Sequence, residues 1–459
     1  MMTLHDAARA LQSPLIGENA LFTGVSTDSR NIAPGDLFVA LKGPSFDGHD
    51  FIEQAHDKGA VGALVAQDLG VKLQEAAFPL ILVPDTRAGL GRLAAHWRRR
   101  FNIPIVAVTG SNGKTTVKEM IALILRRAVG QGMQPDDPDR VLATEGNLNN
   151  DIGVPLMLLR LRESHRYAVI EMGMNHSGEI AYLTRLTRPH AAVITNAGQA
   201  HVGEVGSLDA IARAKGEIFE GLDPGGIAII NADDPYAPLW RNLMGNREVL
   251  DFGLTGNPRV TVRYPHDFLH GELELVLPGG VEHMSLQVPG EHNIQNALAA
   301  AAATIAMGVG ARAIASGLSA FPGVKGRMQQ KRGLCGATLI DDSYNANPDS
   351  VRAALAVLAK AEGEKILVLG DMGELGESAK DFHERIGEEA RIAGIDRLVA
   401  LGEFSVYTAQ KFGEGARHFK KIEELIPEIE NLLRPGVTLL IKGSRFMQME
   451  RVVKHFEFA

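Results

Sequence analysis

One stretch constrains the fold of this chain more than any other, residues 108–116, with the sequence Val-Thr-Gly-Ser-Asn-Gly-Lys-Thr-Thr. The apolar run 105–108 leads into it, and residues 117–126 have the pattern of a helix. A strand, a glycine-rich loop and a helix in this order bring backbone N–H groups and a helix N-terminus together, where phosphates can bind. The sequence therefore predicts an α/β domain with a phosphate-binding loop.

Two side chains of this loop suit nucleotide chemistry. Lys114 is expected to reach the terminal phosphates, and Thr115 is expected to bind magnesium. The loop departs from the common pattern GxxxxGK[ST], because Val108 stands in place of the first glycine. A tight turn with a solvated lysine is the alternative, and the order of strand, loop and helix favours phosphate binding over it.

Two interruptions rich in proline and glycine divide the 459 residues, a length that predicts two to four domains. Residues 101–104 end a basic helix, and residues 321–327 follow an alanine-rich one. We therefore expect segments 1–102, 103–323 and 324–459. In the last two, short apolar runs alternate with longer amphipathic stretches, which predicts parallel sheets with crossover helices. These runs are residues 105–108, 167–170, 192–194, 227–230, 366–369 and 437–441.

Polar side chains follow two of these runs. Glu171 follows the run 167–170, and ligands of open parallel sheets bind at the carboxyl ends of strands, so Glu171 is placed to hold magnesium. The next strand leads to His201, a candidate second metal ligand at the same edge. Taken singly, each residue is equally well explained as a strand-end acid or a loop histidine.

Lys215 falls on the apolar face of its helix. With Ser207 as the N-cap, Ile211, Lys215, Ile218 and Leu222 share one face. Burial lowers the pKa of a lysine, and the neutral amine can then react with carbon dioxide to give an anionic carbamate that suits magnesium. A lysine that extends to the surface is the alternative, which helix spacing alone favours.

The composition excludes several classes of protein. Lys and Arg number 47 against 55 Asp and Glu, a net charge of -8, so no basic field predicts nucleic acid or an anionic membrane as a partner. The single cysteine, Cys335, permits neither an intramolecular disulfide nor a cysteine metal cluster. The longest apolar stretch, residues 297–311, is too short to span a bilayer, and the first residues lack a signal-peptide pattern. We therefore expect a cytoplasmic, enzyme-sized protein without membrane insertion.

Residues 109–116 resemble the ATP loop of the Mur ligase family, which has no glycine at the position of Val108. Further stretches resemble that family in the same order over nearly the whole chain. They are residues 146–155, 171–173, 195–201, 214–217, 290–297, 326–328 and 341–348.

Within the family, residues 342–348, 369–376 and 442–445 resemble the branch that adds D-alanyl-D-alanine to UDP-N-acetylmuramoyl-tripeptide. The Asp-Asn-Pro-Arg motif of the sister branch, which adds diaminopimelate, is absent from the sequence. The resemblance implies an ATP-dependent ligase of peptidoglycan precursor synthesis that works through an acyl phosphate, with the UDP-sugar tripeptide and the dipeptide as its partners. We expect a monomer.

The resemblance also implies an α/β fold of three domains. A small N-terminal α/β domain would bind the UDP-sugar, a central domain with a mostly parallel, P-loop-type sheet would bind ATP, and the C-terminal domain would be Rossmann-like. In the resembling enzymes the last domain closes over the central one, which keeps water from the acyl phosphate.

Residue roles follow from the resemblance for the nucleotide and the metals. One magnesium ion is assigned to Thr115 and Glu171, and a second to His201 and carbamylated Lys215. Asn293 and Asn296 are implied on the adenine side, where a helix cap and a polar helix face are the alternatives. Arg327 and Asp342 are implied as nucleotide contacts from the last domain, with an interdomain salt bridge or a turn as alternatives. The phosphates are assigned to Gly110, Ser111, Asn112, Gly113, Lys114, Thr115 and Thr116.

Substrate contacts are implied in all three segments. Ser29, Arg30 and Lys42 offer donors for diphosphate oxygens, and Asp47 offers an acceptor, although composition alone makes them loop residues. The remaining candidates for the tripeptide and the dipeptide are Asn150, Asn345, Asn347 and Arg445.

Three other functions share part of this pattern. A folylpolyglutamate-type ligase has the same loop and mechanism but a different first domain. A P-loop switch or transport ATPase would hydrolyse ATP without an amine or a carboxylate substrate. A nucleotide-binding scaffold would not need Glu171, His201 and Lys215 together, and their joint presence favours catalysis.

Overall fold

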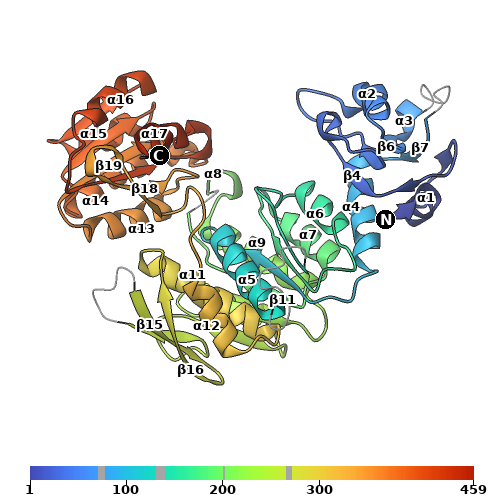
Figure 1. Ribbon diagram of the computed structural model, residues 1–459, viewed down its shortest axis with the longest axis horizontal. Helices are drawn as coiled ribbons and strands as arrows, with labels where there is room; N and C mark the ends of the chain where they lie inside the picture. The colour runs from blue at the N-terminus through green and yellow to red at the C-terminus, as the bar shows by residue number, and fades with distance from the viewer. Residues whose placement is uncertain (71–77, 131–139, 200–201, 265–270, 459) are drawn as a thin grey trace.

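The computed structural model describes residues 1–70, 78–130, 140–199, 202–264 and 271–458. Figure 1 shows an N-terminal region in blue and a C-terminal region in orange and red, which lie apart from each other on the same side of a central region. Each region contains a sheet with parallel strands, so the α/β class is confirmed. The described helices include none with the length and apolar character of a membrane span.

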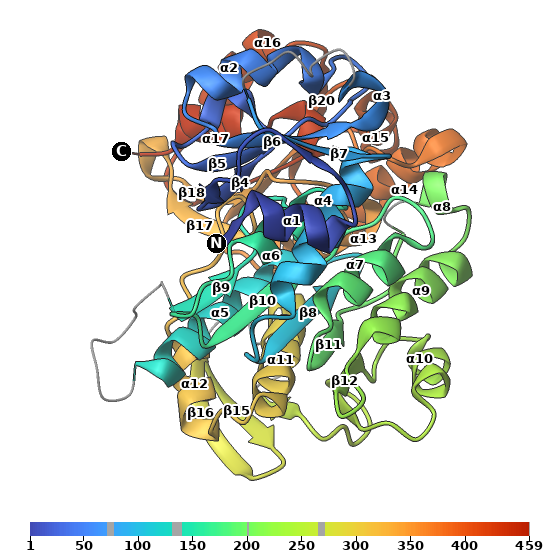
Figure 2. The same cartoon turned by 90° about the vertical axis from the view of Figure 1, so that its right-hand side faces the viewer.

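The central sheet has six parallel strands in the order β13-β12-β11-β8-β10-β9, which Figure 2 shows side by side from β9 to β12. Four of the predicted apolar runs form strands here, and their residues are buried on both faces of the sheet except for the half-buried Tyr167 and Ile227. The strand order reverses at β8, and ligands of such sheets bind at the carboxyl ends of strands beside this reversal. The strands are β8 (Ile105–Thr109), β9 (Val141–Ala143), β10 (Tyr167–Glu171), β11 (Ala191–Ile194), β12 (Ile227–Asn231) and β13 (Val249–Phe252).

Helices cover both faces of the central sheet. One face packs against α5 (Lys114–Val129), α11 (Glu291–Ala306) and α12 (Ala311–Ser319), beside an antiparallel sheet of β14 (Thr261–Arg263), β15 (Gly271–Leu277) and β16 (Gly280–Leu286). Helices α5 and α12 cross so closely that a Cβ atom at Gly317 would lie 2.7 Å from Ile124 Cγ1. The other face packs against α6 (Gly153–Leu159), α7 (Glu179–Thr187), α9 (Leu208–Gly216) and α10 (Ala237–Met244).

The N-terminal region is a small α/β sheet in the order β2-β7-β6-β5-β4, in which only β2 is antiparallel to its neighbour. A separate pair, β1 (Met2–Thr3) and β3 (Leu21–Phe22), lies beside α1, whose N-terminus carries a capping box at Thr3. The elements of the sheet and its helices are β2 (Leu15–Ile16), β4 (Gly24–Ser26), β5 (Asp36–Val39), β6 (Gly62–Ala66), β7 (Leu80–Val83), α1 (Leu4–Leu11), α2 (Ile52–Asp57) and α3 (Gln67–Gly70).

Helix α4 (Thr86–Arg98) joins the N-terminal region to the central one. Its apolar residues belong to a core that runs without interruption from the N-terminal sheet to α6 and α7. The indole nitrogen of Trp97 donates a hydrogen bond to Leu161 O at 3.1 Å. These two regions therefore share one hydrophobic core across the boundary that we expect near residue 102.

The C-terminal region has its own cores on the two faces of a sheet in the order β17-β18-β22-β19-β20-β21. Only β17 is antiparallel to its neighbour, and the predicted runs 366–369 and 437–441 lie in β19 and β22. The strands are β17 (Gln329–Arg332), β18 (Thr338–Asp342), β19 (Glu364–Gly370), β20 (Arg397–Leu401), β21 (Ala416–Phe419) and β22 (Val437–Lys442). The helices are α13 (Pro348–Ala359), α14 (Ala379–Ile392), α15 (Ser405–Phe412), α16 (Ile422–Glu430) and α17 (Glu450–Phe456).

We predict that Arg98→Leu destabilises the shared core. The buried guanidinium of Arg98 donates to Thr187 O at 2.8 Å, to Phe101 O at 2.6 Å and to Arg188 O at 3.2 Å. Leucine would leave these carbonyls without this donor, so the free energy of unfolding should fall by about 3 kcal/mol.

Urea unfolding followed by tryptophan fluorescence measures this effect, because Trp97 and Trp240 both belong to the shared core. Arg99→Leu, at the exposed neighbouring position, serves as the control and should unfold close to wild type. Equal unfolding midpoints for the two variants would contradict the prediction.

Candidate active site

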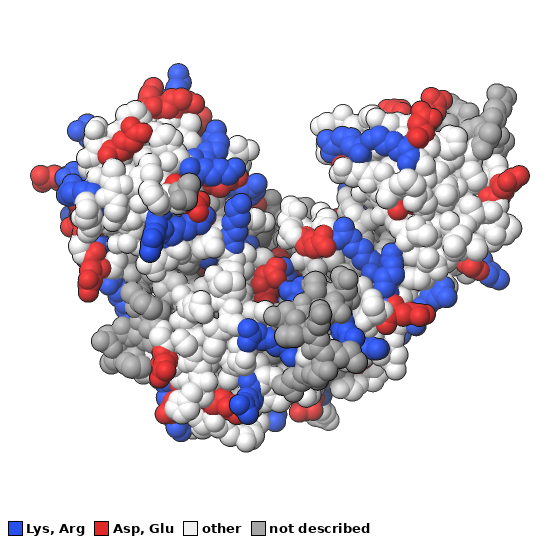
Figure 3. Space-filling model, viewed as in Figure 1, with Lys and Arg blue, Asp and Glu red and all other residues white. Residues whose placement is uncertain are grey.

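A cavity of about 820 Å³ opens where the carboxyl edge of the central sheet meets the C-terminal region. Figure 3 shows the broad hollow between the N-terminal and C-terminal regions above it. The cavity is lined by residues 111–116 from the predicted phosphate loop, by the start of α11 and by loops of the C-terminal region. It therefore lies at the edge of the sheet that the sequence indicates.

The phosphate loop is held by close contact with the end of β11. A Cβ atom at Gly110 would lie 1.8 Å from Thr195 Oγ1, and one at Gly113 would lie 2.3 Å from Asn296 Oδ1. Both glycines have positive φ, 149° and 81°, so the path of the backbone also requires glycine. Helix α5 begins directly after Gly113, and its free N–H groups point toward the cavity end of the loop.

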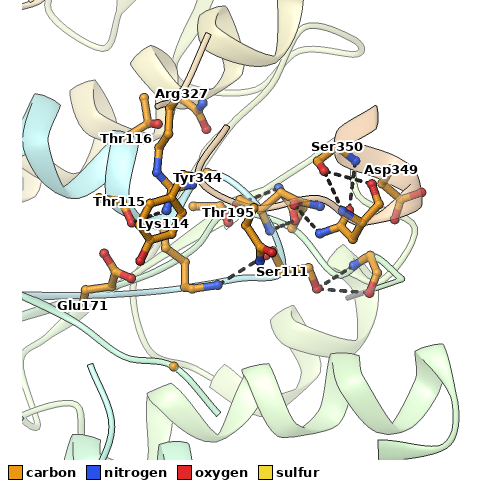
Figure 4. A pocket seen from close by; sticks show the side chains of 18 of the residues that line it. Ser111, Lys114, Thr115, Thr116, Glu171, Thr195, Arg327, Tyr344, Asp349 and Ser350 are labelled. Carbon is orange, nitrogen blue, oxygen red and sulfur yellow. Dashed lines mark hydrogen bonds between the residues drawn. The ribbon is translucent and has the colours of Figure 1, made fainter. Parts of the chain in front are cut away.

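Lys114 lies at the centre of this loop. Its Nζ donates to Gly110 O at 2.7 Å and to Ser111 O at 3.3 Å. Burial lowers its pKa, Glu171 opposes that effect, and Arg327 adds to it. Figure 4 shows Lys114, Thr115 and Arg327 close together, and Arg327 Nη2 donates to Thr115 Oγ1 at 3.0 Å.

Glu171 ends β10 and lines the cavity. Its Oε1 accepts a hydrogen bond from Asn149 Nδ2 at 2.8 Å, whereas its buried Oε2 has no partner among the described residues. A buried carboxylate oxygen of this kind fits a hard cation, which takes oxygen ligands. Among the described residues no group of three or more His, Cys, Asp or Glu could hold a metal ion, so any ion here would need further ligands from Thr115, the nucleotide or water.

Lys215 is buried in α9, with only 1% of its surface exposed. Ser207 caps this helix, as predicted, by accepting a hydrogen bond from Ala210 N. The alternative of a surface lysine is therefore wrong. Its Nζ has no hydrogen-bond partner within the described part of the chain, and burial, reinforced by the charge of Lys114, holds its pKa well below the ordinary value. His201 lies outside the described residues.

Helix α11 presents Asn293 and Asn296 to the cavity. Asn296 Nδ2 donates to Asn293 Oδ1 at 3.1 Å, and Asn293 Nδ2 donates to Pro289 O at 2.7 Å. The N-cap of the helix is Gly290, so the alternative interpretation of Asn293 as the helix cap is wrong.

The C-terminal region contributes Arg327 and Asp342. The guanidinium of Arg327 lies 4.4 Å from the ring centroid of Tyr344, and Asp342 forms a 2.5 Å ion pair with Lys442. Within the described part of the chain the ion pair of Asp342 thus lies inside its own region and is not an interdomain salt bridge. Arg327 instead contacts Thr115 of the central region.

Three of the remaining candidates for substrate binding line the cavity: Asn150, Asn345 and Asn347. Asn347 Nδ2 donates to Asn112 Oδ1 at 2.8 Å across the two regions, and Asn150 Oδ1 accepts from Gly153 N at the start of α6. Arg445 does not line the cavity, and its guanidinium pairs with Glu450 at 2.7 Å.

The four N-terminal candidates lie away from the cavity, Ser29 and Arg30 in a 3-10 helix (Ser29–Asn31), and Lys42 and Asp47 at an isolated β-bridge after β5. Ser29 Oγ donates to Gln54 Oε1 at 2.6 Å, and Arg30 pairs with Asp28 at 2.9 Å. Lys42 Nζ lies 3.9 Å from Asp47 Oδ2. The structure therefore separates these residues from the phosphate loop.

Sequence reasoning missed several side chains that shape the site. Asn149 orients Glu171, Tyr344 stacks on Arg327, Lys442 neutralises Asp342, and His292 lines the cavity. All four lie in or beside stretches that resemble the family, but their partners are far away in the sequence.

Three family models match this chain. The Mur ligase middle domain matches residues 108–304, the Mur ligase glutamate ligase domain matches residues 326–445, and the Mur ligase family catalytic domain matches residues 21–98. The chain belongs to the Mur ligase family.

Among Mur ligases, similar relatives match over almost their whole length. UDP-N-acetylmuramoyl-tripeptide--D-alanyl-D-alanine ligase of Escherichia coli K12 is 44% identical, over 99% of this chain and 98% of the relative. A crystal structure of MurF from Acinetobacter baumannii has a TM-score of 0.90 at 36% identity and covers 99% of this chain and 98% of its own. A crystal structure of MurF ligase from Thermotoga maritima in complex with ADP has a TM-score of 0.80 at 27% identity and covers 94% of this chain and 96% of its own.

We predict that His292 makes folding sensitive to acid. Burial lowers its pKa from 6.5 to about 4, Asp342 opposes the shift and Lys442 adds to it. Below pH 6.5 the unfolded chain takes up a proton that the folded chain resists, so this contribution to stability is present above pH 6.5 and lost as the pH falls toward 4.

Urea unfolding of the wild type and His292→Gln at several pH values across this window checks the prediction. The variant should lose part of the dependence on pH. His176→Gln removes an exposed histidine as the control and should retain the wild-type slope. A wild-type slope in His292→Gln would show that His292 does not carry this effect.

Proposed function

We propose that this chain is an ATP-dependent ligase that joins D-alanyl-D-alanine to the carboxylate of UDP-N-acetylmuramoyl-tripeptide, in peptidoglycan precursor synthesis. The observation that carries the proposal is the 44% identity, over 99% of the chain, to the Escherichia coli enzyme whose name gives this reaction. The cavity between the phosphate loop and the C-terminal region supports it, because the reaction needs ATP, a carboxylate and an amine in one place.

The chemistry explains the charges around the loop. A carboxylate does not condense with an amine in water until one of its oxygens becomes a leaving group. The carboxylate attacks the terminal phosphorus of ATP, the bond to ADP breaks, and an acyl phosphate forms. Lys114 and the loop N–H groups offset the repulsion between the two anions and stabilise the charge of the transferring group. The neutral amine nitrogen then forms the C–N bond, the bond between the acyl carbon and the phosphate oxygen breaks, phosphate leaves, and the nitrogen gives up a proton to water.

Thr115 and Glu171 would hold one magnesium ion, and His201 with carbamylated Lys215 would hold the second. Magnesium supplies positive charge that polarises phosphoryl and acyl oxygens. The buried, unpartnered Nζ of Lys215 and its lowered pKa support the carbamate, because a neutral amine can form a C–N bond to carbon dioxide with release of a proton.

The nucleotide would bind between two regions. Asn293 and Asn296 would contact the adenine side, while Arg327 and Asp342 would contact the nucleotide from the C-terminal region. The contact of Arg327 with Thr115 supports this arrangement. Closure of the C-terminal region over ATP would exclude water from the acyl phosphate.

The substrates would occupy both sides of the ATP site. Ser29, Arg30, Lys42 and Asp47 would bind the UDP part, and Asn150 would lie near the tripeptide. The dipeptide would bind beside Asn345, Asn347 and Arg445. We place the reaction in the cytoplasm with the protein as a monomer, and we expect its loss to stop cell-wall growth and division.

Phosphate release tests the proposal. The purified protein is given ATP and magnesium, and the UDP-sugar tripeptide and the dipeptide are omitted in turn. Sustained release should require both substrates and should match the pentapeptide product in amount. Release that ignores both substrates would identify a plain ATPase, and release with a folate and glutamate would identify a folylpolyglutamate-type ligase.

We predict that Lys114→Ala lowers turnover at least about a hundredfold, because it removes charge that stabilises phosphoryl transfer. The thermal midpoint should stay close to wild type, since Lys114 lies at the cavity and its carbonyl partners can meet water. Lys454→Ala, at an exposed position of α17, is the control. Turnover near wild type in Lys114→Ala would show that Lys114 has no catalytic role.

We predict that Lys215→Ala is nearly inactive and that formate or acetate restores part of its activity by placing an anion in the vacated space. Chloride at the same ionic strength should not restore it. Lys215→Arg should also be inactive, because no carbamate forms on a guanidinium. High activity of Lys215→Arg would contradict the carbamate and leave the ligase proposal standing.

A further inference from the structure

Residues 371–376, the loop after β19, hold one acidic side chain in an unusual backbone conformation. Glu374 has a φ of 62°, in the left-handed region that glutamate rarely adopts. Such a conformation costs about 1 kcal/mol or more and persists only where the surroundings impose it. It is therefore a feature to explain.

Hydrogen bonds of the residues just before Glu374 hold the loop in place. Met372 N donates to His383 Nε2 at 3.0 Å, and Gly373 N donates to Ser444 Oγ at 2.6 Å. The carboxylate of Asp371 accepts hydrogen bonds from Glu403 N at 2.8 Å and from Ser405 N at 2.7 Å. The position of Glu374 is thus set by the C-terminal region itself.

The same loop lies directly on α8 (Val202–Val205) of the central region. Gly203 N donates to Glu374 O at 3.3 Å, and a Cβ atom at Gly203 would lie 2.8 Å from Gly376 N. Figure 1 shows α8 between the central and C-terminal regions. This backbone contact places Glu374 at the junction of the two regions, where the reaction cavity opens.

Glu374 is exposed and lines the cavity. The negative charge of its carboxylate raises the pKa of Lys114. A negative side chain beside a phosphate loop repels phosphate, so Glu374 does not suit the nucleotide. It suits a cation that must come close to the transferred phosphoryl group. In the proposed reaction the organic cation that does so is the ammonium group of the amine substrate.

A positive side chain lies on the adjacent loop. A Cβ atom at Gly373 would lie 3.0 Å from Phe446 Cε1, so residues 444–446 pack against the Glu374 loop. The side chain of Arg445 in this second loop is 59% exposed, lies beside the cavity rather than in its lining, and pairs with Glu450. A carboxylate and a guanidinium on two adjacent loops complement a short peptide with a free amine and a free carboxylate.

We propose that Glu374 binds the ammonium group of the dipeptide and holds its nitrogen toward the activated carboxyl carbon, which the nitrogen attacks after it has lost one proton to water. This inference rests on the proposed ligase function and adds to it the group that recognises the amine. A purely structural loop residue would affect both steps of the reaction, whereas an amine-binding residue affects only the second.

The test separates the two steps with two nucleophiles. Wild type and Glu374→Gln are given ATP, magnesium and the UDP-sugar tripeptide, and then either D-alanyl-D-alanine or hydroxylamine. Hydroxylamine is uncharged at neutral pH, so its hydroxamate product reports acyl phosphate without an ammonium group. Glutamine keeps the shape and the backbone demand of glutamate and removes only the charge.

Glu374→Gln should raise the KM for the dipeptide about 10- to 100-fold, as expected for the loss of a charge-assisted hydrogen bond. Its KM values for ATP and the UDP-sugar tripeptide, and its rate of hydroxamate formation, should stay within about twofold of wild type. Glu377→Gln removes the same charge at an exposed position three residues further on and should behave as wild type.

A second pair of variants tests the same charge in case Glu374→Gln does not fold. Aspartate and asparagine both tolerate positive φ, so Glu374→Asp and Glu374→Asn keep the backbone and differ only in charge. Glu374→Asp should use the dipeptide better than Glu374→Asn, with equal hydroxamate formation.

Two results would overturn the inference while the ligase function stands. One is an unchanged KM for the dipeptide in Glu374→Gln, and the other is an equal loss of amide and hydroxamate formation. If the wild type makes neither product, the proposed function is wrong, and this inference, which rests on it, is wrong as well.

Discussion

The shape of the candidate active site depends on the close contact between the phosphate loop and the end of β11. Thr195 Oγ1 donates to Asn112 O at 2.6 Å, and Asn112 N donates to Asn196 Oδ1 at 2.9 Å. Because a side chain at Gly110 would collide with Thr195, the path of the loop requires glycine at this position. That path sets the direction of Lys114 and the start of α5, and through Thr115 and Asn112 it also provides the surface on which the C-terminal region rests.

The three regions are joined by different kinds of contact. The N-terminal and central regions share an apolar core through α4, whereas the described contacts between the C-terminal and central regions include the polar pairs Arg327–Thr115 and Asn347–Asn112. Apolar cores resist separation, and a few hydrogen bonds at a cavity exchange readily with water or ligand. The C-terminal region is therefore the part best suited to move, and substrate bound between the regions would favour the closed arrangement.

Two groups of the proposed metal sites are buried in the central region. Lys215 Nζ and Glu171 Oε2 are buried without hydrogen-bond partners in the described residues, and the charges of Glu171 and Glu374 partly offset the lowering of the pKa of Lys114 by burial. Buried polar groups without partners reduce stability, so they are better explained by the polyanionic chemistry of the proposed reaction than by folding.

The sequence by itself determined the elements whose signals are local. Apolar runs indicated four of the six central strands, the order of strand, glycine loop and helix indicated the phosphate loop, and helix spacing placed Lys215 on an apolar face. Those patterns work because burial and backbone geometry repeat with the period of each element. His201 lies outside the described residues, so its placement stays a prediction.

Only the tertiary structure decided which distant residues meet. Asn149 reaches Glu171, Tyr344 stacks on Arg327, and Glu374 lines the same cavity as Lys114, although no local pattern joins the members of these pairs. Such relations depend on how whole regions pack, and packing is set by contacts summed over many residues rather than by the residues that carry the chemistry.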